Sequence, residues 1–410
     1  MVRRFVVLWL IASSLCFVGC RENYLAEKAF WRADRALKKL QSESTKMPSP
    51  EALEPVIKKF EIVADKYPSA PKAAESLFVV SNLRVFQKNF EEARKVMERI
   101  LQNYAHMRGL ASQASYNIGT LFESENKWEP AERAFWQTAE YYSLDEKGLY
   151  APVHIIIHYK QLKNEEAAKI AYDRAMEYYQ KAFKDAGLIK VAGVIKNYEA
   201  LAQLTFGEWL KARETWISIY NLIPDSPYGP LGLLAAAELS WKRQDRGTAL
   251  EIYKKFVELY PKHELMPNTL VQIGVLEEEL KNYAVSREWY EKAIKIHEKN
   301  SSKVADLKLF IARSHQLEGN WTQAQIICNE IETKFKDTRA AFEVPLIKAA
   351  YYESNGVPEK SRELLDEAIK RYMELEQKSA PKSFGQLFAK QMLKSCYCFI
   401  ICTKAHSLTK

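Results

Sequence analysis

The chain has 410 residues, of which 60 are Lys or Arg and 52 are Asp or Glu, so its formal net charge at pH 7 is +8. The basic residues are spread along the chain and form no stripe with interleaved aromatic side chains, which argues against nucleic-acid binding. Only 14 residues are glycine, and neither a phosphate-binding glycine loop nor a nucleophile elbow is present in the sequence.

The N-terminus has the pattern of an export signal. Arg3 and Arg4 precede an apolar run over residues 5–18, and Gly19 and Cys20 follow it. Fourteen apolar residues are fewer than the roughly 20 that a membrane-spanning helix needs. The sequence therefore predicts a signal peptide over residues 1–19, and its removal would lower the net charge from +8 to +6 by taking away the two arginines.

The residues around the predicted cut resemble a bacterial lipobox. Phe17, Val18, Gly19 and Cys20 match it except at Phe17, where Leu is usual. The resemblance implies acylation of Cys20 and, because Arg21 rather than Asp follows, an outer-membrane lipoprotein facing the periplasm. The alternative is ordinary signal cleavage and a periplasmic or secreted protein.

One three-residue pattern recurs nine times along most of the chain. An anchor residue is followed three positions later by a small residue and seven positions later by a bulky one. Successive anchors lie 37, 38, 37, 44, 37, 37, 38 and 37 residues apart, which indicates a stack of identical supersecondary units. The anchors are Leu53, Phe90, Trp128, Glu165, Trp209, Arg246, Tyr283, Trp321 and Pro358; the small residues are Val56, Ala93, Ala131, Ala168, Ala212, Ala249, Ser286, Ala324 and Ser361; the bulky residues are Phe60, Met97, Phe135, Tyr172, Trp216, Tyr253, Tyr290, Cys328 and Leu365.

Each unit is predicted to be a pair of helices. Offsets of 0, 3 and 7 lie on one face of an α-helix, and a second apolar helix precedes each anchor. Two residues before the anchor, several units carry a residue that tolerates a left-handed turn, namely Asn126, Gly207, Gly319 and Gly356. We expect an all-α stack of helical hairpins.

The 44-residue interval between Glu165 and Trp209 contains seven residues more than the usual 37. These residues either lengthen the helices by about two turns or form a loop near residues 185–187. The insertion predicts a division into repeats over residues 51–184 and repeats over residues 185–373. An N-terminal anchor, helix and linker over residues 20–50 precede them, and a capping helix with an apolar tail over residues 374–410 follows.

The repeats resemble the tetratricopeptide repeat. The unit ending near His297 matches that pattern through Ile273, Gly274, Tyr283, Tyr290 and Ala293, and neighbouring units match in phase over roughly residues 51–371. The resemblance implies a right-handed α-solenoid of about nine helical hairpins with extra N- and C-terminal helices. It also implies a concave groove that binds protein or peptide partners, lined by Asn82, Tyr116, Thr120, Glu123, Glu238, Trp241, Asn268, Glu278, Arg313 and Gln316.

No residues suggest catalysis or a cofactor. His154 and His158 are spaced for one helix face, but the three residues between them are all Ile, so the glutamate base of a metalloprotease motif is missing and a structural pair is favoured. Cys328 occupies a bulky core position. Cys396, Cys398 and Cys402 are open to a disulfide or to an apolar tail, and a zinc site with His406 is disfavoured because structural zinc sites usually bring paired cysteines from two separate turns. We therefore expect a non-enzyme without metal or cofactor.

The leading hypothesis is a lipid-anchored envelope scaffold that binds protein partners. Segments 66–71 and 223–227 look like those of bacterial outer-membrane tetratricopeptide lipoproteins of the BamD type, although this chain is longer. That likeness implies a role in outer-membrane protein assembly. A scaffold for polysaccharide export or modification is the alternative, and a cell-wall hydrolase is a more remote one. No nucleic-acid partner is expected.

Overall fold

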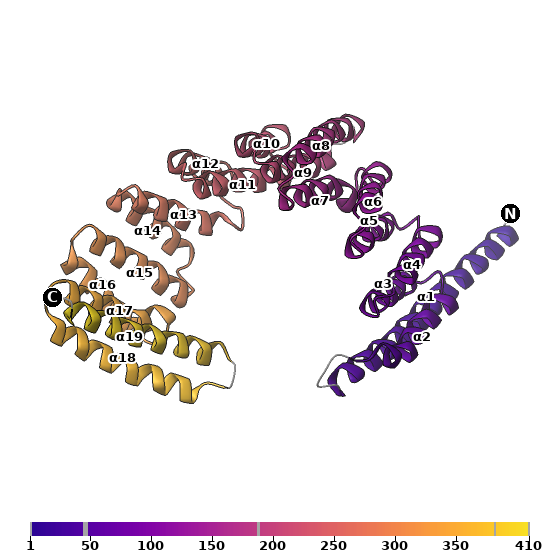
Figure 1. Ribbon diagram of the computed structural model, residues 1–410. Coiled ribbons are helices and arrows are strands. Elements are labelled where there is room, and N and C mark those ends of the chain that lie inside the picture. The colour runs from indigo at the N-terminus through magenta and orange to yellow at the C-terminus, as the bar shows by residue number, and fades with distance from the viewer. Residues whose placement is uncertain (1, 44–47, 187–188, 381–382, 409–410) are drawn as a thin grey trace. The chain divides into compact units, whose positions relative to one another are not determined.

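The computed structural model describes residues 2–43, 48–186, 189–380 and 383–408, and the side chains of residues 21–42, 48–186, 191–380 and 383–398. Over these ranges the backbone forms helices and no strand, and most helices pack against the next one along the chain (Figure 1). The all-α prediction is confirmed. The helices are α1 (Val2–Glu43), α2 (Pro50–Lys66), α3 (Pro71–Phe86), α4 (Phe90–Asn103), α5 (Arg108–Ser124), α6 (Trp128–Tyr141), α7 (Glu146–Gln161), α8 (Glu165–Ala186), α9 (Ile189–Phe206), α10 (Trp209–Leu222), α11 (Tyr228–Lys242), α12 (Arg246–Leu259), α13 (Met266–Glu279), α14 (Tyr283–Ile296), α15 (Ser301–Leu317), α16 (Trp321–Lys334), α17 (Arg339–Ser354), α18 (Pro358–Lys378) and α19 (Phe384–Leu408).

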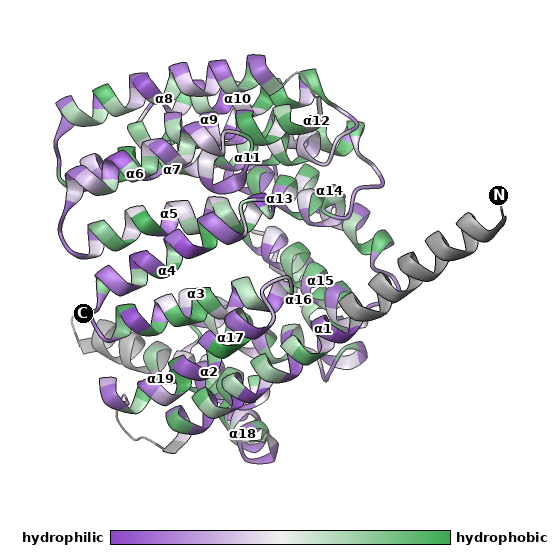
Figure 2. Ribbon diagram, turned by 90° about the vertical axis from the view of Figure 1, so that its right-hand side faces the viewer, coloured by the Kyte–Doolittle hydropathy of each residue, from purple (hydrophilic) through white to green (hydrophobic). Residues whose placement is uncertain are grey.

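The repeat pattern places the second helix of every hairpin. From α4 to α18, each even-numbered helix begins at the predicted anchor residue, for example α6 at Trp128 and α14 at Tyr283. The small residue three positions later is at most 5% exposed in all nine repeats, and the bulky one is at most 8% exposed. The helices carry both hydrophobic and hydrophilic residues along their length, as expected of helices that are buried on one side only (Figure 2). Close approach of neighbouring helices therefore depends on the small position, and the bulky side chain fills the space beside it.

The turn inside each hairpin has one recurring geometry. The residue two positions before the anchor has a positive φ from 56° to 119° in eight hairpins. The following amide donates a hydrogen bond back to the carbonyl five residues earlier, as from Asn320 to His315, which closes the helix in a Schellman-type turn. Asparagine or aspartate then caps several second helices, and Asn89, Asn164, Asp245 and Asn320 accept from a backbone amide of the first turn.

The inserted residues lengthen helices. Helix α8 has 22 residues, whereas α4, α6, α10, α12, α14 and α16 have 14 each. Contacts between residues divide the chain into two compact units, Met1–Gly232 and Leu233–Lys410, which we call the N-terminal unit and the C-terminal unit. This division lies later in the chain than the boundary after residue 184 that the insertion indicated. The longer α8 keeps its packing on α7 and α9, so the insertion does not interrupt the stack.

Helix α1 forms the first hairpin with α2, and α19 is an additional helix at the C-terminal end. In α1, Ala26 and Ala33 are fully buried against α2 and α3. In α19, Met392 and Cys396 pack on Leu365 and Tyr372 of α18, as expected of a cap. None of the helices, over the part of the chain described, is both long and apolar enough to cross a membrane.

The structure describes the side chains of three cysteines, Cys328, Cys396 and Cys398. Cys328 is fully buried in the core, as predicted, and burial raises the pKa of its thiol to about 11. Cys396 and Cys398 carry free thiols. The side chains of Cys20 and Cys402 lie outside the described residues, so acylation of Cys20 stays a prediction.

Candidate functional site

The first helices of neighbouring hairpins form one surface within each unit. Helix α3 contacts α5, α5 contacts α7 and α7 contacts α9, and α15 contacts α17 in the same way. We call this surface the first-helix face. All ten predicted groove residues lie on these odd-numbered helices, and the structure places them in different environments.

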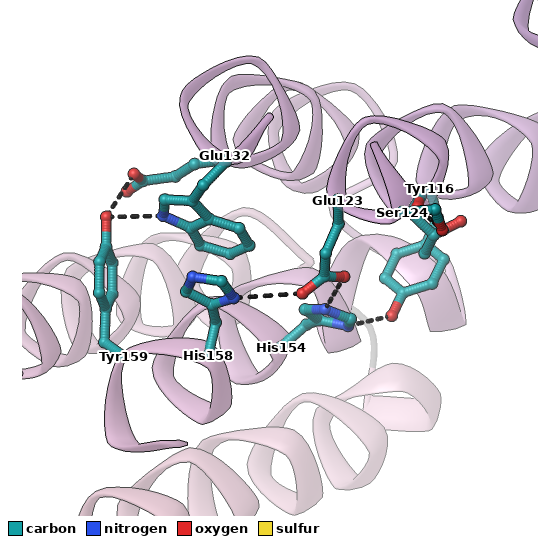
Figure 3. A network of polar contacts seen from close by, with 9 residues as sticks. Tyr116, Glu123, Ser124, Glu132, His154, His158 and Tyr159 are labelled. Carbon is teal, nitrogen blue, oxygen red and sulfur yellow. Dashed lines mark hydrogen bonds and ion pairs between the residues drawn. The ribbon is translucent and has the colours of Figure 1, made fainter. Parts of the chain in front are cut away.

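In the N-terminal unit, a hydrogen-bonded network occupies the first-helix face. Glu123 of α5 lies between the two histidines of α7, with its Oε2 atom 2.9 Å from His154 Nε2 and its Oε1 atom 3.2 Å from His158 Nδ1 (Figure 3). The Tyr116 hydroxyl lies 2.5 Å from His154 Nδ1, so both ring nitrogens of that histidine are engaged. These contacts give the histidine pair a structural role across two helices.

Aromatic stacking extends this network to α6. The rings of His158 and Trp128 stack with their centroids 3.3 Å apart and their planes 1° apart. Trp128 Nε1 donates to the Tyr159 hydroxyl at 2.9 Å, and that hydroxyl donates to Glu132 at 2.6 Å. The network therefore ties α5, α6 and α7 together, and it uses polar groups that a partner would otherwise contact.

The predicted residues of this unit differ in exposure. Tyr116 is 8% exposed, and burial raises the pKa of its hydroxyl. Thr120 is half-buried and donates to the carbonyl of Asn117 within its own helix. Asn82 lies exposed on α3. Tyr116 and Glu123 thus belong to one structural cluster, which the other two do not join.

In the C-terminal unit, the first-helix face contains a hollow. Its volume is about 450 Å³, and it lies between α11 and α13, with Tyr253 of α12 at its edge. Three predicted groove residues, Glu238, Trp241 and Asn268, line it together. We call it the Trp241 hollow. The other lining residues are Leu234, Lys242, Tyr253, Leu265, Thr269 and Gln272.

The indole of Trp241 is held in place by a carboxylate of the neighbouring first helix. Its Nε1 atom lies 3.2 and 3.3 Å from the two carboxylate oxygens of Glu279, and Arg246 donates to the same carboxylate at 2.5 Å. Tyr253 packs edge-on against the indole, with the centroids 6.4 Å apart. Glu238 pairs with Lys242 at 2.6 Å, both side chains being mostly exposed. A fixed aromatic ring beside exposed amide and charged groups suits a peptide segment.

The surroundings of Tyr253 change the pKa of its hydroxyl. Burial, followed by the nearby negative charge of Glu238, raises the pKa of its hydroxyl to about 12. Like any tyrosine, Tyr253 is protonated at neutral pH, and the raised pKa extends this to more alkaline pH. Its hydroxyl can therefore donate a hydrogen bond at the edge of the hollow.

The remaining predicted residues lie elsewhere in the C-terminal unit. Glu278 is half-buried, and its Oε1 atom is buried without a hydrogen-bond partner among the described residues. Burial raises the pKa of its carboxyl, and nearby hydroxyl groups and Arg313 partly offset this. Arg313 pairs with Glu343 at 2.8 Å and lines a separate hollow of about 720 Å³ beside α19. Gln316 is half-buried on α15.

Six lining residues were not predicted as groove residues, namely Leu234, Lys242, Tyr253, Leu265, Thr269 and Gln272. Tyr253 was assigned only to the core, as the bulky residue of its repeat. Thr269 and Gln272 lie one and four positions after Asn268. The four-residue spacing places Gln272 on the same helix face as Asn268, so the sequence contained a signal for Gln272. Over the described residues, no group of three or more His, Cys, Asp or Glu side chains is arranged to hold a metal ion.

Residues 267–300, which cover α13 and α14, match the tetratricopeptide repeat model. They form a tetratricopeptide repeat. The hairpins on both sides repeat its helix lengths and turn geometry, so the structure is a stack of tetratricopeptide-like units. Such repeats indicate a scaffold for protein–protein interaction.

Comparisons with other proteins add little beyond the fold. No curated protein sequence matches the chain. A Pyrococcus horikoshii STAND protein with a tetratricopeptide repeat sensor is 16% identical, with 86% of this chain and 53% of that one covered and a TM-score of 0.42. A tetratricopeptide repeat protein from Parabacteroides merdae is 14% identical, with 79% and 98% covered and a TM-score of 0.34. BtubC from P. vanneervenii is 11% identical, with 63% and 90% covered and a TM-score of 0.34. At these values, none of the three indicates a partner for this chain.

Proposed function

We propose that this protein is a lipid-anchored envelope scaffold that captures a protein partner in the Trp241 hollow. The observation that carries the proposal is the convergence of Glu238, Trp241 and Asn268 on one hollow of the first-helix face. The hollow combines a fixed indole with exposed polar groups, which is a common composition for an energetic anchor point in a protein interface.

The envelope location rests on the sequence alone. The export signal over residues 1–19 and the lipobox-like residues before Cys20 favour acylation at that cysteine. Multiple acyl chains give stable attachment to a membrane. With the likeness of segments 66–71 and 223–227 to outer-membrane repeat lipoproteins, this supports a role in the assembly of outer-membrane proteins.

The experiment is affinity capture of tagged full-length protein from detergent-solubilised membranes, with chemical crosslinking and mass spectrometry. Trp241→Ala is compared with Trp289→Ala, because Trp289 lies on a second helix of the same unit and outside the hollow. We expect loss of the indole to reduce capture of the partner at least about 30-fold, the effect of an anchor worth about 2 kcal/mol. Thermal unfolding of both variants checks that each is folded.

The outcomes separate the parts of the proposal. Capture of barrel-assembly proteins that depends on Trp241 supports the complete account, and Cys20→Ala is expected to abolish the incorporation of a labelled acyl chain into the protein. Capture of polymer-export proteins would support the scaffold and overturn the assembly role. Equal capture by the two tryptophan variants would overturn the Trp241 hollow as the partner site.

A further inference from the structure

Helix α1 presents a second surface, on the side that faces away from the stack. Tyr24 and Trp31 are 62% and 57% exposed, although large aromatic side chains are usually buried when a core is available. The inner side of the same helix holds the buried Ala26 and Ala33 and packs on α2 and α3. The two exposed aromatic residues therefore make no contribution to that core.

The exposed aromatic residues alternate with basic ones along one stripe. At 100° per residue, positions 24, 28, 31, 35 and 38 fall within about 80° of the helix circumference. They are Tyr24, Lys28, Trp31, Arg35 and Lys38, and we call them the α1 stripe. The stripe is about 21 Å long, because 14 residues rise about 1.5 Å each.

The exposed part of α1 carries a net positive charge. Residues 21–42 contain six Lys or Arg and three Asp or Glu, a net charge of +3. Among the three acidic residues, Glu22 accepts a hydrogen bond from Ser69 and Asp34 pairs with Lys38. Glu27 lies exposed at the margin of the stripe. The guanidinium of Arg35 lies 5.4 Å from the centre of the Trp31 ring, so aromatic and cationic groups share one surface.

We infer that the α1 stripe lies on the surface of an anionic lipid bilayer. Trp and Tyr rings favour the boundary between headgroups and acyl chains, and Lys and Arg beside them are attracted to anionic headgroups. A straight helix with its apolar and basic groups in one line can lie flat on such a surface. The stripe begins only four residues after Cys20, about 6 Å along the helix, where an acyl anchor would hold it at the bilayer.

This surface is independent of the Trp241 hollow, and its test does not need acylation. The full chain carrying Cys20→Ser is labelled with 5-fluorotryptophan and added to vesicles of phosphatidylcholine alone or with phosphatidylglycerol, both containing a doxyl-labelled lipid. The readout is paramagnetic broadening of the Trp31 fluorine resonance, assigned with Trp31→Phe. Trp136, which is 5% exposed, is the internal reference. This local readout is needed because the apolar run over residues 5–18 attaches the chain to either bilayer.

Relative to vesicles of the same composition without the doxyl label, we expect the label to broaden the Trp31 resonance strongly on anionic vesicles and much less on neutral ones. We expect no label-dependent broadening of the Trp136 resonance on either. Lys28→Gln combined with Arg35→Gln is expected to weaken the contact about 25-fold, since each basic residue near an anionic surface contributes about a fivefold preference. Lys169→Gln with Lys181→Gln removes the same charge from exposed positions of α8 and is expected to change nothing.

Two results would overturn the inference. One is a Trp31 resonance that the doxyl label of anionic vesicles broadens no more than it broadens that of Trp136. The other is crosslinking from position 31 to a protein instead of lipid in intact membranes. Capture through Trp241 would be unaffected by either result, so the proposed function and this surface fail separately.

Discussion

The first-helix face differs between the two units although the repeat pattern is the same. In the N-terminal unit, Glu123 bridges His154 and His158, and the face is crossed by bonds within the protein. In the C-terminal unit, Trp241 and Asn268 lie around a hollow of about 450 Å³. The same helix positions therefore serve internal structure in one unit and remain accessible to a partner in the other.

The difference teaches that a groove position cannot be assigned from the repeat alone. Tyr116 and Trp241 are both aromatic residues on first helices, and each hydrogen-bonds to a residue of the next first helix, His154 and Glu279 respectively. Tyr116 is 8% exposed, whereas Trp241 is half-buried and lines the hollow. The packing around a residue, and not its type, decides which role its side chain has.

The largest expected effect tests whether the two units share one core architecture. Phe135 and Tyr290 occupy the same bulky position in different units, and both are 0% exposed. We expect Phe135→Ala and Tyr290→Ala each to lower the free energy of unfolding by about 3–5 kcal/mol, through lost burial and a cavity. Hydrogen exchange should show the loss of protection concentrated in the unit that carries the substitution. Equal loss in both units would contradict the division.

The next effect concerns the network of the N-terminal unit. Glu123→Ala removes the bonds to both histidines and is expected to cost about 2 kcal/mol of unfolding free energy, because two half-buried imidazole rings lose a hydrogen-bond partner. Partner capture should be unchanged. Glu129→Ala, at an exposed position of the same unit, serves as the control and should cost less than about 0.5 kcal/mol. Loss of capture in Glu123→Ala would show that the network is itself a binding site.

A smaller effect concerns the half-buried carboxyl of Glu278 in the C-terminal unit. Burial raises the folded-state pKa of the Glu278 carboxyl above its ordinary value of 4.5. The folded state therefore holds this proton more tightly than the unfolded state, and stability decreases as pH rises above about 4.5 through the folded pKa. Glu278→Gln should raise the Tm at pH 7, and the gain should shrink as pH falls towards 4.5. A Tm difference independent of pH would contradict this.

The smallest expected effect on stability concerns Lys281, in the turn between α13 and α14. Lys281 has a φ of 65°, where a residue with a Cβ atom is strained by about 1–2 kcal/mol. Lys281→Gly removes that strain but adds about 0.5–1 kcal/mol of backbone entropy cost, so a net gain of roughly 0.5 kcal/mol in unfolding free energy is expected. Gly356→Ala, at a φ of 75°, should have the opposite sign in the same denaturant titration. Destabilisation by Lys281→Gly would show that its side chain contributes more than its backbone strain costs.

The fold was largely predictable because its signals are local and repeated. The anchors marked the first residue of eight second helices, and the small and bulky positions marked the core. Turn geometry was predictable only where Gly or Asn stood. Lys88, Lys163, Gln244 and Lys281 adopt the same left-handed conformation, imposed by the helices on either side of the turn.

The site was less predictable, since it depends on contacts between helices about 30 residues apart. The bonds from Glu123 to His154 and His158 require the register of α5 against α7, which no local pattern contains. The Trp241 hollow depends equally on α13 lying opposite α11. For the same reason the length of the insertion was evident in the sequence, whereas the division at Gly232 was not.

The central claim is that the partner contacts the C-terminal unit at the Trp241 hollow, whereas the network occupies the corresponding face of the N-terminal unit. The most direct test is a photocrosslinking amino acid placed in living cells at Asn268 or, in the other unit, at Thr120. The account predicts a partner crosslink from position 268 that disappears with Trp241→Ala, and none from position 120. A crosslink from position 120 without one from position 268 would contradict it.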